Sequence, residues 1–172
     1  TTIGSVTQLS GTDLQAKLNA ATPGSLLLLN GEAIVSAPVT LNSGQVLRGG
    51  GTTITLTGAS SGKVFAYTIP GSNGIIKGAV AGDAVVKMAA NSTLRDVRVE
   101  NTSTDSNAWA ISATNVTGAT LQNVTMVSAA GGLKLSNSNN FTMTGSRITA
   151  AQDSAINVSG GTGLDLNGNT LT

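Results

Sequence analysis

The fold is decided by three stretches with one pattern: Ile111-Ser-Ala-Thr-Asn-Val-Thr-Gly-Ala-Thr-Leu121, Leu133-Lys-Leu-Ser-Asn-Ser-Asn-Asn-Phe-Thr-Met143 and Ile156-Asn-Val-Ser-Gly-Gly-Thr-Gly-Leu-Asp-Leu166. Their last residues are 22 and then 23 positions apart, since 143 − 121 = 22 and 166 − 143 = 23. Within each stretch apolar residues alternate with polar ones, as in short strands with one buried face. A single turn of this kind cannot bury its own apolar face, whereas stacked turns share a core. The repeat predicts a parallel β-solenoid with coils of about 22 residues.

One coil is longer than the others. Leu94 fits the same column as Leu121, but these two residues are 27 positions apart, because 121 − 94 = 27. The extra residues are expected in the polar segment Glu100–Trp109, which ends on the single tryptophan of the chain. We therefore expect this segment to protrude from the stack.

The composition suits such a solenoid. The chain has 172 residues, of which 10% are charged and 2% aromatic, with 22 glycines and neither cysteine nor histidine. An α/β enzyme of this size usually carries more charged and aromatic residues and more cysteine and histidine. A narrow solenoid core instead takes small and β-branched side chains. We predict one domain, with no cofactor and no metal.

Charge and hydropathy also limit the partners. The formal net charge is +1 and there is no basic run, which argues against nucleic acid. The longest aliphatic run, Ser25–Asn30, is far too short to cross a membrane. Low charge with abundant Ser, Thr, Asn and Gly is usual for exported bacterial surface chains. We therefore expect an extracellular or cell-surface location.

A single helix is predicted near the N-terminus. Thr12-Asp-Leu-Gln15 has the form of a capping box, in which Gln15 would reach back to the first turn. Leu14, Leu18 and Ala21 would form one apolar face. We assign residues 1–24 to a lead-in and capping helix, which covers the open end of the core, and residues 25–172 to the coils.

Two further segments complete the predicted organisation. Thr53–Thr57 is expected to continue the stack after a glycine-rich corner, whereas residues 58–82 are the least regular part. At the other end, Leu164–Thr172 is still in register and no capping element follows it. A bare strand edge is prone to pairing. We expect either further coils of a longer parent chain or pairing through that end.

The N-terminal part resembles a known superfamily. Asp13–Gly24, the leucine-rich strand after it, and Leu41–Gly50 are similar to the opening of pectin-lyase-like right-handed parallel β-helix proteins. Asn115 and Asn137 resemble the internal asparagine ladder of that fold, which would break at Gly160. Members include polysaccharide lyases and hydrolases, phage tailspikes, and passenger segments of bacterial adhesins and autotransporters. The resemblance implies the fold, which does not by itself select an activity.

The hydrolase motif of that superfamily is absent. Its polygalacturonase-like members use an Asp cluster, a His and an Arg-Ile-Lys element. Here the nearest run, Arg147–Thr149, lacks the lysine, and the sequence contains no histidine. A pair of carboxylates across a cleft remains conceivable, with Asp83 or Asp105 facing Asp96.

A lyase-like site is the other enzymatic alternative. It would need acidic groups converging on calcium, and an Arg or Lys that accepts a proton. Asp96 and Glu100 lie on one coil beside Arg95 and Arg98, so Asp96 and Arg98 are the candidates if the chain is an enzyme. No acidic column forms, however, because Asp96 stacks on Asn123, Gly145 and Gly168. A mixed-charge solvated face is the simpler interpretation.

Protruding segments are the candidates for binding. In the segment Asn101–Trp109, Asp105 could contact a ligand, and Trp109 could stack on a sugar ring or contact a protein. The second candidate segment, residues 67–82, begins with Tyr67. The alternative for Trp109 is simple packing over a coil.

Taken together, these patterns favour a noncatalytic segment of a secreted or cell-surface bacterial protein. It would act as an adhesin-like binding module or as a stalk, with a polysaccharide or a host or neighbouring cell surface as partner. The alternative is a truncated carbohydrate-active enzyme, either a polysaccharide lyase or hydrolase or a tailspike-like depolymerase.

Overall fold

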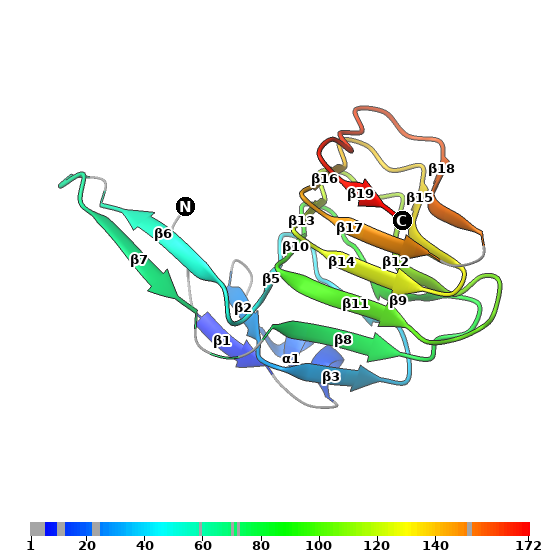
Figure 1. Cartoon of the computed structure of the whole chain (residues 1–172), viewed down its shortest axis with the longest axis horizontal. Coiled ribbons are helices and arrows are strands. Elements are labelled where there is room, and N and C mark those ends of the chain that lie inside the picture. Colours follow the sequence, from blue (N-terminus) through cyan, green and yellow to red (C-terminus); the bar gives the residue numbers. More distant parts are fainter. Residues whose placement is uncertain are drawn as a thin grey trace.

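The computed structural model describes residues 6–9, 13–21, 25–58, 60–69, 71, 73–150 and 153–172. These residues form parallel sheets stacked as a β-solenoid of about six turns, with one short helix near the N-terminus (Figure 1). The predicted parallel β-solenoid is therefore confirmed.

Three parallel sheets form the sides of the solenoid. Sheet A contains, in spatial order, β1 (Val6–Leu9), β2 (Leu26–Leu29), β5 (Val46–Gly49), β10 (Thr93–Arg95), β13 (Thr120–Gln122) and β16 (Thr142–Thr144). Sheet B contains β3 (Glu32–Val35), β8 (Gly74–Gly78), β11 (Val97–Asn101), β14 (Thr125–Ser128), β17 (Arg147–Ala150) and β19 (Thr170–Leu171). Sheet C contains β4 (Val39–Thr40), β9 (Ala84–Lys87), β12 (Trp109–Thr114), β15 (Gly131–Ser136) and β18 (Ser154–Ser159).

The predicted columns are the observed strand registers. In sheet A, Leu94 pairs with Leu121 and Leu121 with Met143. The columns through sheets B and C pair in the same way: Met126, Ile148 and Leu171 in sheet B, and Ile111, Leu133 and Ile156 in sheet C. Side chains at these positions are fully buried in the inner coils. In the last coil the expected strand at Leu164–Leu166 is reduced to a single bridge between Thr142 and Asp165.

Left-handed residues make the corners between the strands. The A-to-B corner repeats at Asp96, Asn123, Gly145 and Gly168, all with φ between 52° and 69°. Two other corner columns also have positive φ: Gly44, Asn91, Gly118, Asn140 and Gly163, and then Asn115, Asn137 and Gly160. Asn, Asp and Gly tolerate this conformation better than other residues. At most of these corners the amide donates to a carbonyl of the next coil, so the corners also connect the turns.

The prediction that Asn115 and Asn137 form an internal ladder is wrong in one respect, namely that these side chains do not lie inside the solenoid. Both side chains are exposed, and both residues have left-handed backbone, with φ of 55° and 48°. The column contains asparagine because the corner requires positive φ. Glycine meets that requirement equally well, which explains Gly160 in the next coil.

We expect Asn137→Val to lower the free energy of unfolding by about 1–2 kcal/mol, because a β-branched residue is strained at positive φ. The matched control Asn137→Gly should change the free energy of unfolding by only a few tenths of the loss expected for Asn137→Val, since glycine adopts φ > 0 readily. Urea unfolding followed by circular dichroism measures both. Equal losses for the two variants would contradict a backbone origin.

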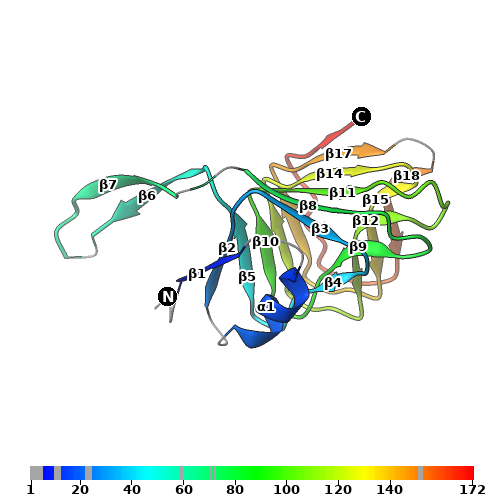
Figure 2. The same ribbon diagram turned by 90° about the horizontal axis from the view of Figure 1, so that it is seen from below.

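Helix α1 (Leu14–Ala20) packs against the N-terminal end of the stack (Figure 2). Leu14 and Leu18 are buried in the core, as predicted. The capping box is not formed as expected: Thr12 lies outside the described residues, and Gln15 does not reach back. Instead, Gln15 Oε1 accepts a hydrogen bond from the Thr40 amide at 2.6 Å, which connects the helix to β4.

The segment Thr53–Thr57 does not continue the stack. It forms β6, which pairs antiparallel with β7 (Val64–Thr68) in a hairpin that projects from the solenoid (Figures 1 and 2). Its place in sheet B, between β3 and β11, is taken by β8. The segment 58–82, expected to be the least regular, thus contains two strands, β7 and β8 (Gly74–Gly78). The segment Thr53–Thr57 forms a hairpin and not a coil strand because Gly58 and Gly62 close a turn, with Gly62 at φ 62°.

Candidate functional site

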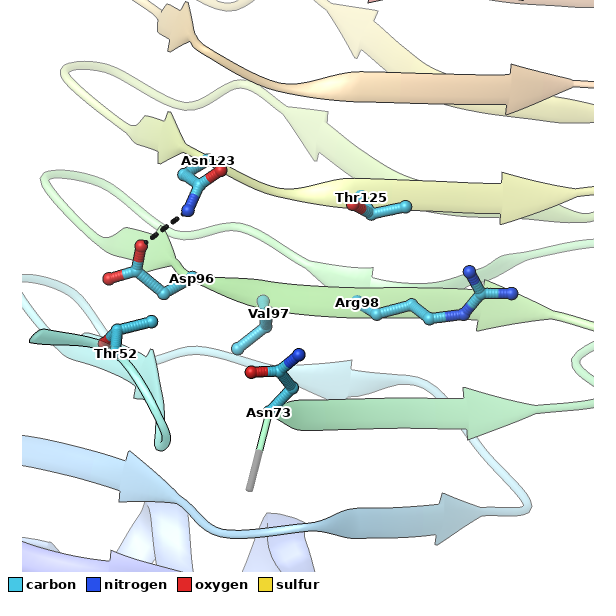
Figure 3. Close-up of a pocket in the computed structure, with 7 residues that line it drawn as sticks. All are labelled: Thr52, Asn73, Asp96, Val97, Arg98, Asn123 and Thr125. Atoms are coloured by element: carbon cyan, nitrogen blue, oxygen red, sulfur yellow. Dashed lines mark hydrogen bonds between the residues drawn. The ribbon is translucent and has the colours of Figure 1, made fainter. Parts of the chain in front are cut away.

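A small cavity lies where the hairpin joins the solenoid (Figure 3). Its volume is about 220 Å³, and it is lined by Thr52, Asn73, Asp96, Val97, Arg98, Asn123 and Thr125. Thr52 and Asn73 belong to the two ends of the hairpin, and the other five belong to the A-to-B corner and the start of sheet B. The cavity thus exists only because the hairpin projects beside that corner.

The neck of the hairpin is held by backbone hydrogen bonds. The Gly51 amide donates to the Ile69 carbonyl at 3.0 Å, and the Ile69 amide donates to the Thr52 carbonyl at 2.8 Å. Gly51 has φ 74°, and a Cβ on it would come within 3.1 Å of the Gly71 carbonyl oxygen. A glycine is therefore needed for the close approach of the two ends.

Asp96 anchors the cavity wall. Its side chain is only 8% exposed, and Oδ2 lies 2.8 Å from Nε of Arg48 and 3.3 Å from Nε of Arg95. The Arg48 Nε–H is not aimed at the carboxylate, so that contact is a charge pair and not a hydrogen bond. Asp96 Oδ1 accepts a hydrogen bond from Asn123 Nδ2 at 2.9 Å. Asp96 therefore connects three successive turns of the solenoid.

Arg48 is held by the same corner. Burial lowers the pKa of its guanidinium, an effect that the neighbouring Asp96 carboxylate partly offsets. Its Nη2 donates to Thr52 Oγ1 at 3.2 Å, which fixes the first residue of the hairpin neck. A buried charge that loses its partner is strongly destabilising. The ion pair with Asp96 is therefore part of the structural frame of the cavity.

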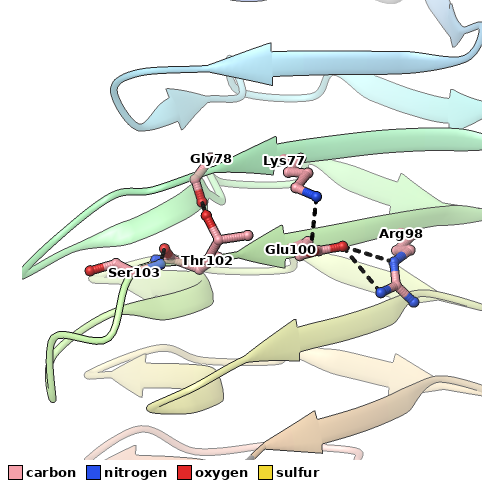
Figure 4. A network of polar contacts seen from close by, with 7 residues as sticks. Lys77, Gly78, Arg98, Glu100, Thr102 and Ser103 are labelled. Carbon is pink, nitrogen blue, oxygen red and sulfur yellow. Dashed lines mark hydrogen bonds and ion pairs between the residues drawn. The ribbon is translucent and has the colours of Figure 1, made fainter.

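Arg98 faces a carboxylate on its own strand (Figure 4). Its Nε and Nη2 donate to Glu100 Oε2 at 3.2 and 3.1 Å, and Lys77 Nζ of the preceding coil lies 3.3 Å from Glu100 Oε1. Burial raises the pKa of Glu100, but the hydrogen bonds from Arg98 and Lys77 outweigh that effect and leave the pKa below its ordinary value of 4.5. This network joins β8 and β11 beside the cavity.

We expect Glu100→Gln to lower the free energy of unfolding at about pH 7 and to have a smaller effect in acid. Because the folded pKa of Glu100 is lowered, its contribution is present above the unfolded pKa and is lost as the pH falls through the folded value. Urea unfolding of wild type and variant across that range measures the difference.

The exposed Asp153, which forms no ion pair among the described residues, supplies the control Asp153→Asn. An effect of Glu100→Gln as large in acid as at neutral pH would contradict the ion-pair interpretation.

Asp96 and Arg98, the candidates of the lyase-like alternative, both line the cavity, and the guanidinium of Arg98 is directed to Glu100. The two other acids proposed opposite Asp96 do not line it. Asp83 pairs with Lys87 at 2.6 Å, and Asp105 caps a turn by accepting the Asn107 amide at 2.8 Å. No group of three or more acidic residues within the described ranges is placed to hold a metal ion.

The three residues predicted to bind a ligand lie in different places. Trp109 begins β12 and is only 4% exposed, with its ring against Gly131 and the Lys134 Nζ 6.0 Å from the ring centroid. A ring buried in this way offers no face for stacking. Tyr67, by contrast, is 51% exposed on the hairpin. Asp105 lies at an exposed turn before β12.

Asn101 is a residue whose role sequence reasoning missed. It is only 2% exposed, and its Nδ2 donates to three carbonyls, those of Val80, Asp83 and Trp109, at 3.0, 3.2 and 2.9 Å. Its Oδ1 accepts the amides of Val80 and Ser103. The side chain therefore joins the connections that follow β8 and β11. Its position at the start of a polar segment suggested a solvated loop and gave no signal of burial.

We expect Asn101→Ala to lower the free energy of unfolding by about 2–3 kcal/mol, because buried amides and carbonyls would lose their partners. Exposed Asn107 supplies the control Asn107→Ala, which should stay within about 0.5 kcal/mol of wild type. Chemical unfolding monitored by Trp109 fluorescence measures both. Wild-type stability of Asn101→Ala would contradict this role.

The described part of the chain contains no helix long and apolar enough to cross a membrane. In comparisons with known proteins, no protein-family model matches the chain, no curated protein is significantly similar, and no solved structure matches.

Proposed function

We propose that this chain is a noncatalytic β-solenoid segment of a secreted or cell-surface bacterial protein, in which the coils act as a rigid stalk and the hairpin as an adhesin-like contact element. The observation that carries the proposal is the hairpin itself. Val64, Phe65 and Tyr67 are all more than half exposed on a ribbon that projects from the stack. Exposed apolar groups that cluster in this way usually mark an interaction site.

The rest of the solenoid supports a stalk. Coils repeat at about 4.8 Å, so each added turn extends a straight and rigid body. The outward positions of the inner coils are mostly polar, with Ser and Thr alongside charged residues, and the buried columns are continuous from coil to coil. A low charge and these polar faces also support the proposed extracellular location. The N-terminal pattern supports placing the chain among pectin-lyase-like proteins.

The charged groups of the cavity wall support a structural role over a chemical one. Asp96 faces Arg48 and Arg95, and Arg98 faces Glu100. A carboxylate or guanidinium held in such pairs is poorly placed to exchange protons with a substrate. The second candidate function, a polysaccharide lyase or hydrolase, is favoured by one observation, namely that Asp96 and Arg98 line the same cavity.

The proposal is tested by binding to polysaccharides and to bacterial and host cells, with and without calcium. We expect the double variant Phe65→Ser and Tyr67→Ser to lose most of the binding while circular dichroism stays unchanged, because the exposed apolar contact is removed. Val158→Ser is the matched control, since Val158 is also exposed but lies on β18.

The same incubations are assayed for new reducing or unsaturated ends. Turnover that is abolished by Arg98→Gln would overturn the noncatalytic proposal in favour of the enzyme. Binding that survives the hairpin double variant would overturn the role of the hairpin.

A further inference from the structure

We propose that the cavity at the base of the hairpin binds one residue of a neutral saccharide. This inference rests on the proposed function as a binding module and names the ligand class of a second contact point. It is carried by the hydrogen-bonding groups, the charge and the size of the cavity.

Four uncharged polar side chains surround the cavity: Thr52, Asn73, Asn123 and Thr125. Each amide or hydroxyl group can both donate and accept hydrogen bonds. Among the described residues, the side chains of Asn73 and Thr125 make no hydrogen bond, and the side chain of Asn123 makes one, from Nδ2 to Asp96. The lining of the cavity therefore carries unused donors and acceptors. Sugar hydroxyls, which also donate and accept, match such an array.

The charges of the lining cancel. Among the described residues that line the cavity, Asp96 and Arg98 are the charged ones, one negative and one positive. Each also faces a counter-charge of its own: Asp96 the guanidinium of Arg48, and Arg98 the carboxylate of Glu100. A ligand with a full charge would have to compete with these ion pairs. A neutral ligand can use the remaining lone pairs of Asp96 without breaking its ion pair.

The size of the cavity and its lining also fit a single sugar residue. The volume of about 220 Å³ is below the roughly 300–1,000 Å³ that is typical of drug-sized ligands, so it suits one sugar ring or the end residue of a longer glycan. Val97, which is only 4% exposed, is the one apolar residue among the described lining residues. No aromatic side chain is among the lining residues, so a nucleobase would lack a stacking partner.

The test is a titration of the whole chain with D-galactose, D-glucose, D-mannose, N-acetyl-D-glucosamine and D-galacturonate, followed by ligand-observed NMR. We expect at least one neutral sugar to bind. The double variant Asn73→Ala and Thr125→Val should weaken its Kd about tenfold, because two hydrogen bonds are lost. The matched control is Asn107→Ala with Thr120→Val, at two positions outside the lining, and it should bind as wild type does.

Three results would overturn the inference: no neutral sugar binds, the cavity variant binds as well as the control, or D-galacturonate binds more tightly than D-galactose. None of these depends on the exposed hairpin side chains Phe65 and Tyr67. Loss of cell binding in the Phe65→Ser and Tyr67→Ser variant, with sugar titrations negative, would leave the proposed function standing and this inference refuted. Sugar binding that responds to the cavity variant, without any cell or polysaccharide binding, would refute the proposed function alone.

Discussion

The geometry of the corner is the constraint on which this structure depends. A coil has to change direction between sheets within one residue or two, and it has to do so at the same place in every turn for the strands to remain about 4.8 Å apart. Residues with positive φ achieve this, and the A-to-B corner repeats Asp96, Asn123, Gly145 and Gly168 with φ of 56°, 52°, 58° and 69°. Once the corners are in register, the parallel strands and the buried apolar columns between them follow.

The same constraint supplies polar groups to the cavity. Asp and Asn are among the few side chains that tolerate left-handed backbone, and at an outer corner they face away from the apolar core. Asp96 and Asn123 are at the corner because of their backbone, yet their side chains form part of the cavity wall. The cavity is completed by Thr52 and Asn73, which come from an insertion that has no counterpart in the other coils. The polar groups of the cavity therefore have two origins: the residues with positive φ at the corner, and the two ends of the inserted hairpin.

Polar residues inside the fold are placed by the demands of irregular segments. The side chain of Asn101 makes five hydrogen bonds to backbone groups in the connections that follow β8 and β11 and at the start of β12. Trp109 begins β12, and its ring packs against Gly131 of the next coil. Any larger residue at position 131 would collide with this ring. The long coil is accordingly an ordered part of the core at its two ends, and its exposed part is limited to the turn around Asp105.

The sequence by itself determined the stack. Apolar residues at every second position, repeated at intervals of 22 and 23, can be buried only by parallel strands in register, and that relation is local to each coil and its neighbours. It did not determine where the pattern is interrupted. Thr53–Thr57 alternates like any coil strand, and only the tertiary structure decided that it pairs with Val64–Thr68, because a turn closed at Gly58 and Gly62 brings that partner near. Burial of Trp109 and Asn101, and the meeting of Thr52 and Asn73 with Asp96, likewise depend on contacts between segments far apart in the chain, which alternation and spacing do not encode.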